Sequence, residues 1–175
     1  MLRIALRTAL AATVFLAACS DSEDEPGSSI FSGEMTGDYT AALVGEAVFG
    51  VTLDDNAQAV GTALILGEGS PVRIVLFGNT TSRPRAGVYA IVAPSSPASS
   101  DTVFQGSLTY LVGGVSQAYE IRGGSITFTR VNHNRVTGRL NLHAEQTSPA
   151  DSAQISILGM FDAGQIPQVF PQPQD

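Results

Sequence analysis

The chain has 175 residues, with nine basic against sixteen acidic side chains, a formal net charge of −7 and no tryptophan. A net negative protein repels nucleic-acid phosphates and anionic lipid headgroups, and no cluster of basic residues offsets this, so we expect no nucleic-acid partner. The single cysteine, Cys19, excludes a disulfide within the chain. Stability must therefore come from packing and hydrogen bonds.

The first eighteen residues have the pattern of a secretory signal peptide. Arg3 and Arg7 precede an uncharged stretch, residues 8–18, and polar residues follow directly after it. The uncharged stretch is shorter than the roughly 20 residues that a membrane-spanning helix needs. We predict that residues 1–18 direct export and are then removed.

The segment Leu16-Ala17-Ala18-Cys19 resembles the lipobox of bacterial lipoproteins. The resemblance implies cleavage before Cys19 and lipidation of its sulfur, with two or three acyl chains, each contributing about 0.8 kcal/mol per buried CH₂. The alternative is an ordinary secretory signal that is cut elsewhere. Ser20, where an aspartate favours retention at the inner membrane in enteric lipoproteins, implies the outer membrane, with the protein facing the periplasm.

The mature chain after this cleavage divides into three segments. Residues 19–35 contain the predicted lipidated cysteine and an acidic, serine-rich stretch, which we interpret as a flexible tether rather than a calcium site. Residues 36–163 are the predicted β domain. Residues 164–175 are rich in proline and glutamine and predict an extended tail, in which Val169 and Phe170 either pin the tail to the domain or dock a partner.

Short alternating runs broken by glycine, proline, asparagine and aspartate predict strands throughout the β domain. The expected strands are Tyr39–Val44, Ala47–Leu53, Ala59–Leu66, Val72–Phe77, Val88–Ala93, Val103–Val112, Ala118–Ile121, Ser125–Val131, Arg135–Glu145 and Gln154–Phe161. In the clearest of them, Val136, Leu140, Leu142 and Ala144 alternate with polar residues, which predicts one buried face and one wet face.

These elements predict an all-β fold made of a single antiparallel domain of about 8–10 strands. Residues 132–134, Asn-His-Asn, predict a hairpin turn, and the glycine pairs 113–114 and 123–124 are interpreted as turns. Glycines within strands favour a strongly curved sheet or barrel, with a two-sheet sandwich as the alternative. The alternation and glycine placement over the last third of the chain resemble small β-rich lipoproteins of unknown function, a resemblance that implies no site residues.

No constellation of catalytic or metal-binding residues is apparent in the sequence. It lacks a Gly-x-Ser-x-Gly motif, and we expect His133, in the hairpin turn, and His143, on a polar strand face, to be exposed. Two histidines and no free cysteine are too few ligands for zinc. Carboxylates could converge in space, although most are expected on outer faces; they are Glu46, Asp54, Asp55, Glu68, Glu120, Glu145 and Asp162. Two polar pairs are also expected, Glu120 with Arg122 and Arg130 with Arg139.

These observations lead to one main functional hypothesis and two alternatives. We expect a non-enzymatic lipoprotein, anchored through Cys19 and without a cofactor, whose β domain is an interaction or scaffold module for an envelope protein partner. The first alternative is a carrier that encloses a small apolar, lipid-like ligand in a barrel interior. The second is a hydrolase that uses scattered carboxylates. A filled interior favours the scaffold, whereas an apolar cavity favours the carrier.

Overall fold

The computed structural model describes residues 29–53, 59–78, 84–96, 103–147 and 152–166. The predicted signal peptide, Cys19, the tether as far as residue 28 and the tail from residue 167 lie outside these ranges. The described residues contain no helix with the length and apolar character needed to cross a membrane.

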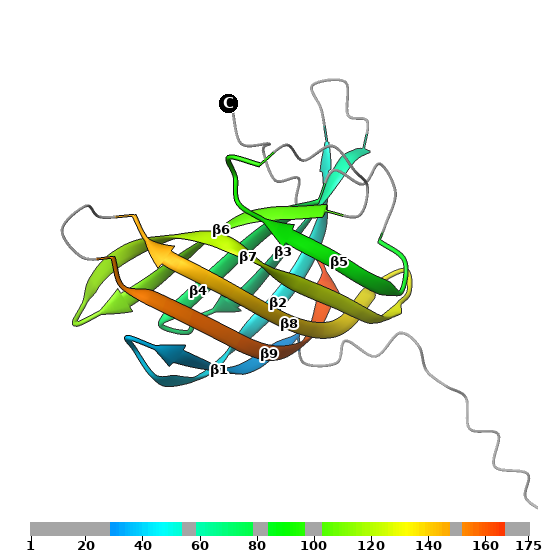
Figure 1. Cartoon of the computed structure of the whole chain (residues 1–175). Helices are drawn as coiled ribbons and strands as arrows, with labels where there is room; N and C mark the ends of the chain where they lie inside the picture. The colour runs from blue at the N-terminus through cyan, green and yellow to red at the C-terminus, as the bar shows by residue number, and fades with distance from the viewer. Residues whose placement is uncertain (1–28, 54–58, 79–83, 97–102, 148–151, 167–175) are drawn as a thin grey trace, which may run out of the picture.

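The structure is all-β, as the sequence predicts (Figure 1). Its strands are β1 (Ile30–Gly37), β2 (Ala41–Leu53), β3 (Ala59–Glu68), β4 (Val72–Gly78), β5 (Gly87–Val92), β6 (Val103–Val112), β7 (Val115–Val131), β8 (Arg135–Gln146) and β9 (Gln154–Gln165). All nine belong to one sheet that closes into a ring, in the order β1-β2-β3-β4-β6-β5-β7-β8-β9. The two-sheet alternative is therefore not observed.

The ring is mainly but not wholly antiparallel. Two short strands separate their neighbours over part of the sheet: β1 lies between β2 and β9, and β5 lies between β6 and β7. Where β1 and β5 end, the strands on either side pair with each other, β2 with β9 in parallel and β6 with β7 antiparallel. The pairing of β5 with β6 is also parallel. The expectation of a purely antiparallel sheet is thus corrected at two junctions.

The two ends of the ring differ in what they carry. We call the end at which β1 begins and β9 finishes the entry end, because Ile30 pairs with Asp162 there and the N–H of Gly164 donates to Ser29 Oγ. The opposite end, where the β1–β2 and β6–β7 turns lie, we call the far end. Ser29, the first described residue, therefore lies at the entry end.

Four predicted boundaries are wrong. Residues 164 and 165, assigned to the tail, belong to β9 and pair with β2. Residues 30–35, assigned to the tether, form most of β1, where Phe31 and Met35 are buried. The strands expected on either side of Gly45 are one strand, β2, with a register shift after Glu46. The strands on either side of the glycine pair 123–124 are likewise one strand, β7, with a register shift between Ile121 and Gly123. Glycine here marks bulges within long strands instead of turns.

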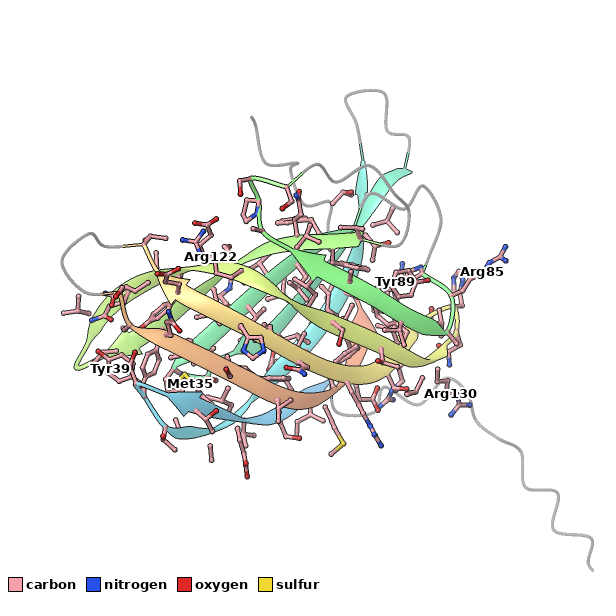
Figure 2. The ribbon with its side chains drawn as sticks, in the orientation of Figure 1. Met35, Tyr39, Arg85, Tyr89, Arg122 and Arg130 are labelled. Atoms are coloured by element: carbon pink, nitrogen blue, oxygen red, sulfur yellow. The ribbon has the colours of Figure 1, made fainter. Side chains whose placement is uncertain are left out.

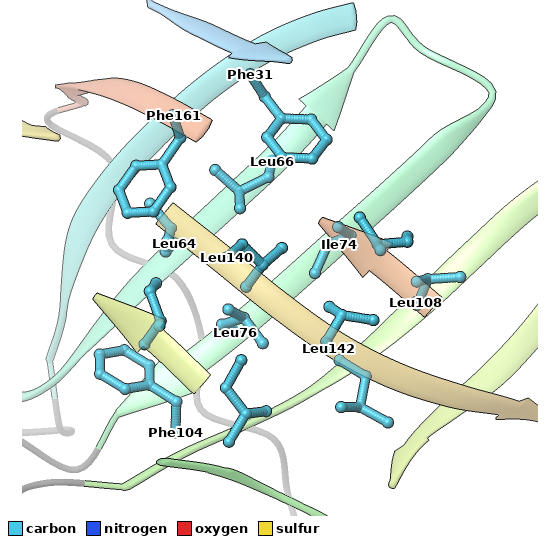
Figure 3. Close-up of a cluster of buried hydrophobic side chains, with 14 of the residues drawn as sticks. Phe31, Leu64, Leu66, Ile74, Leu76, Phe104, Leu108, Leu140, Leu142 and Phe161 are labelled. Carbon is cyan, nitrogen blue, oxygen red and sulfur yellow. The ribbon is translucent and has the colours of Figure 1, made fainter. Parts of the chain in front are cut away.

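The interior of the ring is filled by apolar side chains. Every inward residue predicted on β8, namely Val136, Leu140, Leu142 and Ala144, is buried. Aromatic rings form a connected series from Tyr89 through Phe128 to Phe161, with edge-to-face centroid separations of 5.4 and 5.8 Å. Figure 3 shows aliphatic side chains from several strands, among them Leu64, Leu76 and Leu140, in the same interior as Phe161 and Phe104. The ring thus encloses a packed core.

Glycines make room for these aromatic rings. Gly33 of β1 faces Gly159 of β9 in register, on the inward side of both strands. A Cβ on Gly159 would lie 2.5 Å from the ring of Phe31, and one on Gly33 would lie 2.5 Å from the carbonyl oxygen of Leu158. Because no larger residue fits, the backbones of β1 and β9 pack directly onto the core.

Replacing Leu140 with aspartate tests the packed interior. The substitution Leu140→Asp puts an uncompensated charge among buried side chains. Because domains have stabilities of only about 5–15 kcal/mol, we expect it to abolish cooperative unfolding in a thermal melt. The neighbouring change Asn141→Asp, on the exposed face of β8, should leave the melting temperature within a few degrees of the parent. Equal melts for the two variants would contradict the inward orientation of Leu140.

Candidate functional site

A groove of about 590 Å³ lies on the outer face of β1, β9, β8 and β7. Two adjacent cross-strand rows form it. One row runs Ser32, Met160, Arg139, Thr127, and the other runs Glu34, Leu158, Asn141, Ser125. We call this the outer groove.

The outer groove lies over the paired glycines Gly33 of β1 and Gly159 of β9. Gly33, Gly159 and the backbone of Leu140 form part of its lining. The closely packed glycine pair lets the sheet surface sink toward Phe31, and the outward side chains of the neighbouring residues stand around the depression. The same residues therefore shape the core on one side and the groove on the other.

The groove combines polar groups with two exposed apolar side chains. Leu158 and Met160 are 60% and 59% exposed, although they lie on the wet face of β9. Around them are hydroxyls, one amide, one carboxylate (Glu34) and one guanidinium (Arg139). Such a surface offers both hydrogen bonds and apolar anchors, as protein interfaces do.

A smaller hollow of about 250 Å³ continues along β8 and β9 and contains His143 and Ser156. His143 Nδ1 and Ser156 Oγ are 2.7 Å apart, a separation suited to a base and a nucleophile. The two residues are, however, direct partners across an antiparallel ladder, whose backbone N–H groups are used in strand pairing. The contact is a hydrogen bond between cross-strand neighbours. His143 is exposed, as predicted.

The predicted carboxylates in the described part of the chain are distributed over the surface, each near an arginine or alone. Arg122 lies 2.9 Å from Glu120 and 2.9 Å from Glu145, so the predicted Glu120–Arg122 pair forms as part of a triad joining β7 to β8. Glu68 pairs with Arg73, and Glu46 is exposed on β2. Exposed pairs of this kind contribute about 0–1 kcal/mol each. Asp54 and Asp55 lie outside the described residues.

The predicted pair of Arg130 with Arg139 is wrong, and the sequence did not predict the ion pair that Arg135 forms with Asp162. Arg130 lies opposite Thr137, and Arg139 lies opposite Thr127, because β7 has a register shift between Phe128 and Arg130. Arg135 instead binds Asp162 through both carboxylate oxygens, with Nη2 donating to Oδ2 at 2.8 Å. These hydrogen bonds raise the pKa of Arg135, and they link β8 to β9.

Three tyrosines lie at the far end of the ring, Tyr39, Tyr110 and Tyr119, and Figure 2 labels Tyr39 there. The rings of Tyr39 and Tyr110 meet edge to face, with centroids 5.4 Å apart. Burial raises the pKa of Tyr119, and the nearby Tyr39, Tyr110 and Asp38 raise this pKa further. The four residues therefore form one cluster, in which the charge of Asp38 acts on a buried phenol.

Groups of three or more metal-ligating side chains are not found within the described residues. No family model, curated protein or solved structure matches the chain. We therefore infer function from the geometry of the outer groove and the tyrosine cluster.

Sequence reasoning missed both the groove and the tyrosine cluster. A signal for the groove was present: on β9 the buried positions Ile155, Ile157 and Phe161 alternate with Leu158 and Met160, which are too apolar for a wet face. The cluster had no local signal, because Tyr39 and Tyr110 meet only through the closure of the ring.

Proposed function

We propose that this protein is a lipid-anchored, non-enzymatic interaction module of the bacterial cell envelope, held at the outer membrane through acylated Cys19 and facing the periplasm. The ring of strands is, in this proposal, a strongly curved barrel whose interior serves stability alone. The carrying observation is the packed core: Phe31, Phe104, Phe128 and Phe161 occupy the space that a lipid-like ligand would need. The carrier alternative is therefore less well supported.

The outer groove is the surface that we propose for a protein partner. Leu158 and Met160 project from it into solvent and provide apolar anchors, and the surrounding hydroxyls, Asn141, Glu34 and Arg139 can satisfy the polar groups of a bound segment. Interfaces commonly have this composition, with a small apolar centre and a polar rim. The groove lies on the side of the ring, so a partner can reach it while the chain is anchored beyond the entry end.

The anchor is tested by Cys19→Ala. We expect the variant to lack the acyl mass and to leave the membrane fraction, because one anchor residue carries all of the lipid. The measurement is the intact mass of the protein and its distribution after an alkaline wash of the membranes. Unchanged retention of the variant in washed membranes would sink the lipid-anchor proposal.

The groove is tested by Leu158→Glu in the full-length protein in its native membranes. Chemical cross-linking of the parent should give a discrete protein adduct, and a charge at the apolar centre should reduce its yield by about tenfold. Thr109→Glu places the same charge on the exposed face of β6, outside the groove, and should leave the adduct unchanged. Equal adduct yields from both variants would show that the groove is not the contact surface.

A further inference from the structure

The β6–β7 hairpin extends past the far end of the ring. Leu108 and Tyr119, which face each other across these strands, are fully buried. Two pairs further along the same face, Val112 lies opposite Val115, which is 64% exposed. Gly113 and Gly114 close the hairpin with φ values of 57° and 87°, as a tight two-residue turn requires. The inward face of the hairpin tip, beyond the pair of Tyr110 with Gln117, thus exposes most of Val115 and part of Val112.

Tyr39 extends this surface from the neighbouring turn. Its ring packs on Tyr110 at an interplanar angle of 67°, and Asp38 is its neighbour in the chain. Both tyrosines are half-buried. An aromatic ring face attracts a cation, and a cation beside a carboxylate is bound more strongly.

Asp38 is held in place by β9. Its N–H donates to the carbonyl oxygen of Gln154 at 3.0 Å, and the N–H of Gln154 donates to Asp38 Oδ2 at 2.6 Å. The carboxylate is exposed and has oxygen lone pairs left for another donor. The adjoining hairpin is also fixed, because the N–H of Leu111 donates to the carbonyl oxygen of Pro71 at 2.8 Å. The cluster is therefore preorganised for binding.

Acidic and basic side chains are concentrated at opposite ends of the ring, and this distribution favours one kind of partner at the far end. Among described residues, the far end has two arginines, Arg73 and Arg122, and a surplus of three negative charges, because its carboxylates are Asp38, Glu46, Glu68, Glu120 and Glu145. At the entry end, where Figure 2 labels Arg85 and Arg130, the pair of Arg135 with Asp162 is balanced and leaves a surplus of two positive charges. An acidic far end attracts cationic groups and repels anionic headgroups and nucleic acids.

We propose that Asp38, Tyr39 and Tyr110 bind a lysine or arginine side chain of a partner protein, and that Val112 and Val115 accept the apolar residues next to it. This second surface goes beyond the outer groove and rests on the proposed role as an interaction module. It lies at the end of the ring opposite to Ser29, the first described residue.

The test is a titration of the purified full-length mature protein with two synthetic peptides, Leu-Lys-Leu-Lys-Leu and Leu-Glu-Leu-Glu-Leu, followed by amide NMR shifts. The lysine peptide should shift the amides of Asp38, Tyr39, Tyr110 and Val115, whereas the glutamate peptide should not. Because the chain has no tryptophan, tyrosine emission gives an independent readout. Absence of binding at millimolar lysine peptide, or equal binding of both peptides, would overturn the proposal.

Matched variants separate this site from general charge attraction. Asp38→Asn removes one charge but keeps an oxygen that can accept from the Gln154 N–H, and it should weaken lysine-peptide binding by about tenfold. Glu34→Gln removes one charge in the outer groove and should change the affinity by less than about twofold. Equal losses in the two variants would overturn the site.

The same purified protein is used to test two other possible occupants of the far end, a second copy of the chain and a lipid surface. Concentration-dependent dimerisation that Val115→Ser abolishes would assign the surface to a second copy of the chain. Shifts of the same far-end amides with phosphatidylglycerol vesicles would assign it to a lipid surface. Either result would contradict the proposal, and neither depends on whether the outer groove or the Cys19 anchor fails its own test.

Discussion

The packing of large aromatic side chains against glycines is the constraint on which this structure depends. Phe31 fits beneath Gly159 at a distance that no Cβ could share, and Phe161 fits in the same way beside Gly138. This arrangement closes the ring, because β1 and β9 are the strands that it joins. It also fills the interior and hollows the outer face above the glycine pair, so that one interaction determines both the stability of the ring and the location of its groove.

The parts of the fold that could be predicted from sequence are those that depend on local alternation. Val136, Leu140 and Leu142 were assigned to the buried face because every second residue of β8 is apolar, and the turn at residues 132–134 followed from residues that tolerate it. β1 was missed because Gly33 stands at an inward position between Phe31 and Met35 and hides their alternation. Only the pairing of β1 with β9, from the other end of the chain, makes this segment a strand.

The candidate surfaces were less predictable, because they depend on register between distant strands. Met160 meets Ser32 and Arg139 only through the pairing of β9 with both of its neighbours, and Tyr39 meets Tyr110 only in the closed ring. The shift after Phe128 moves Arg130 away from Arg139, a change that no local pattern indicates. The excess of apolar residues on the exposed face of β9 was the sequence feature that could have indicated the groove. It does not identify a partner.

Because the ring is filled, we propose that recognition takes place on the outside of this protein. The most direct measurement is native mass spectrometry of the intact mature protein, extracted gently from its own host's membranes. The account predicts that the only small-molecule mass is the acyl groups on Cys19, with any further mass being that of a protein. A stoichiometric additional mass of lipid size, retained by the folded protein, would contradict the account and show that the interior holds a ligand.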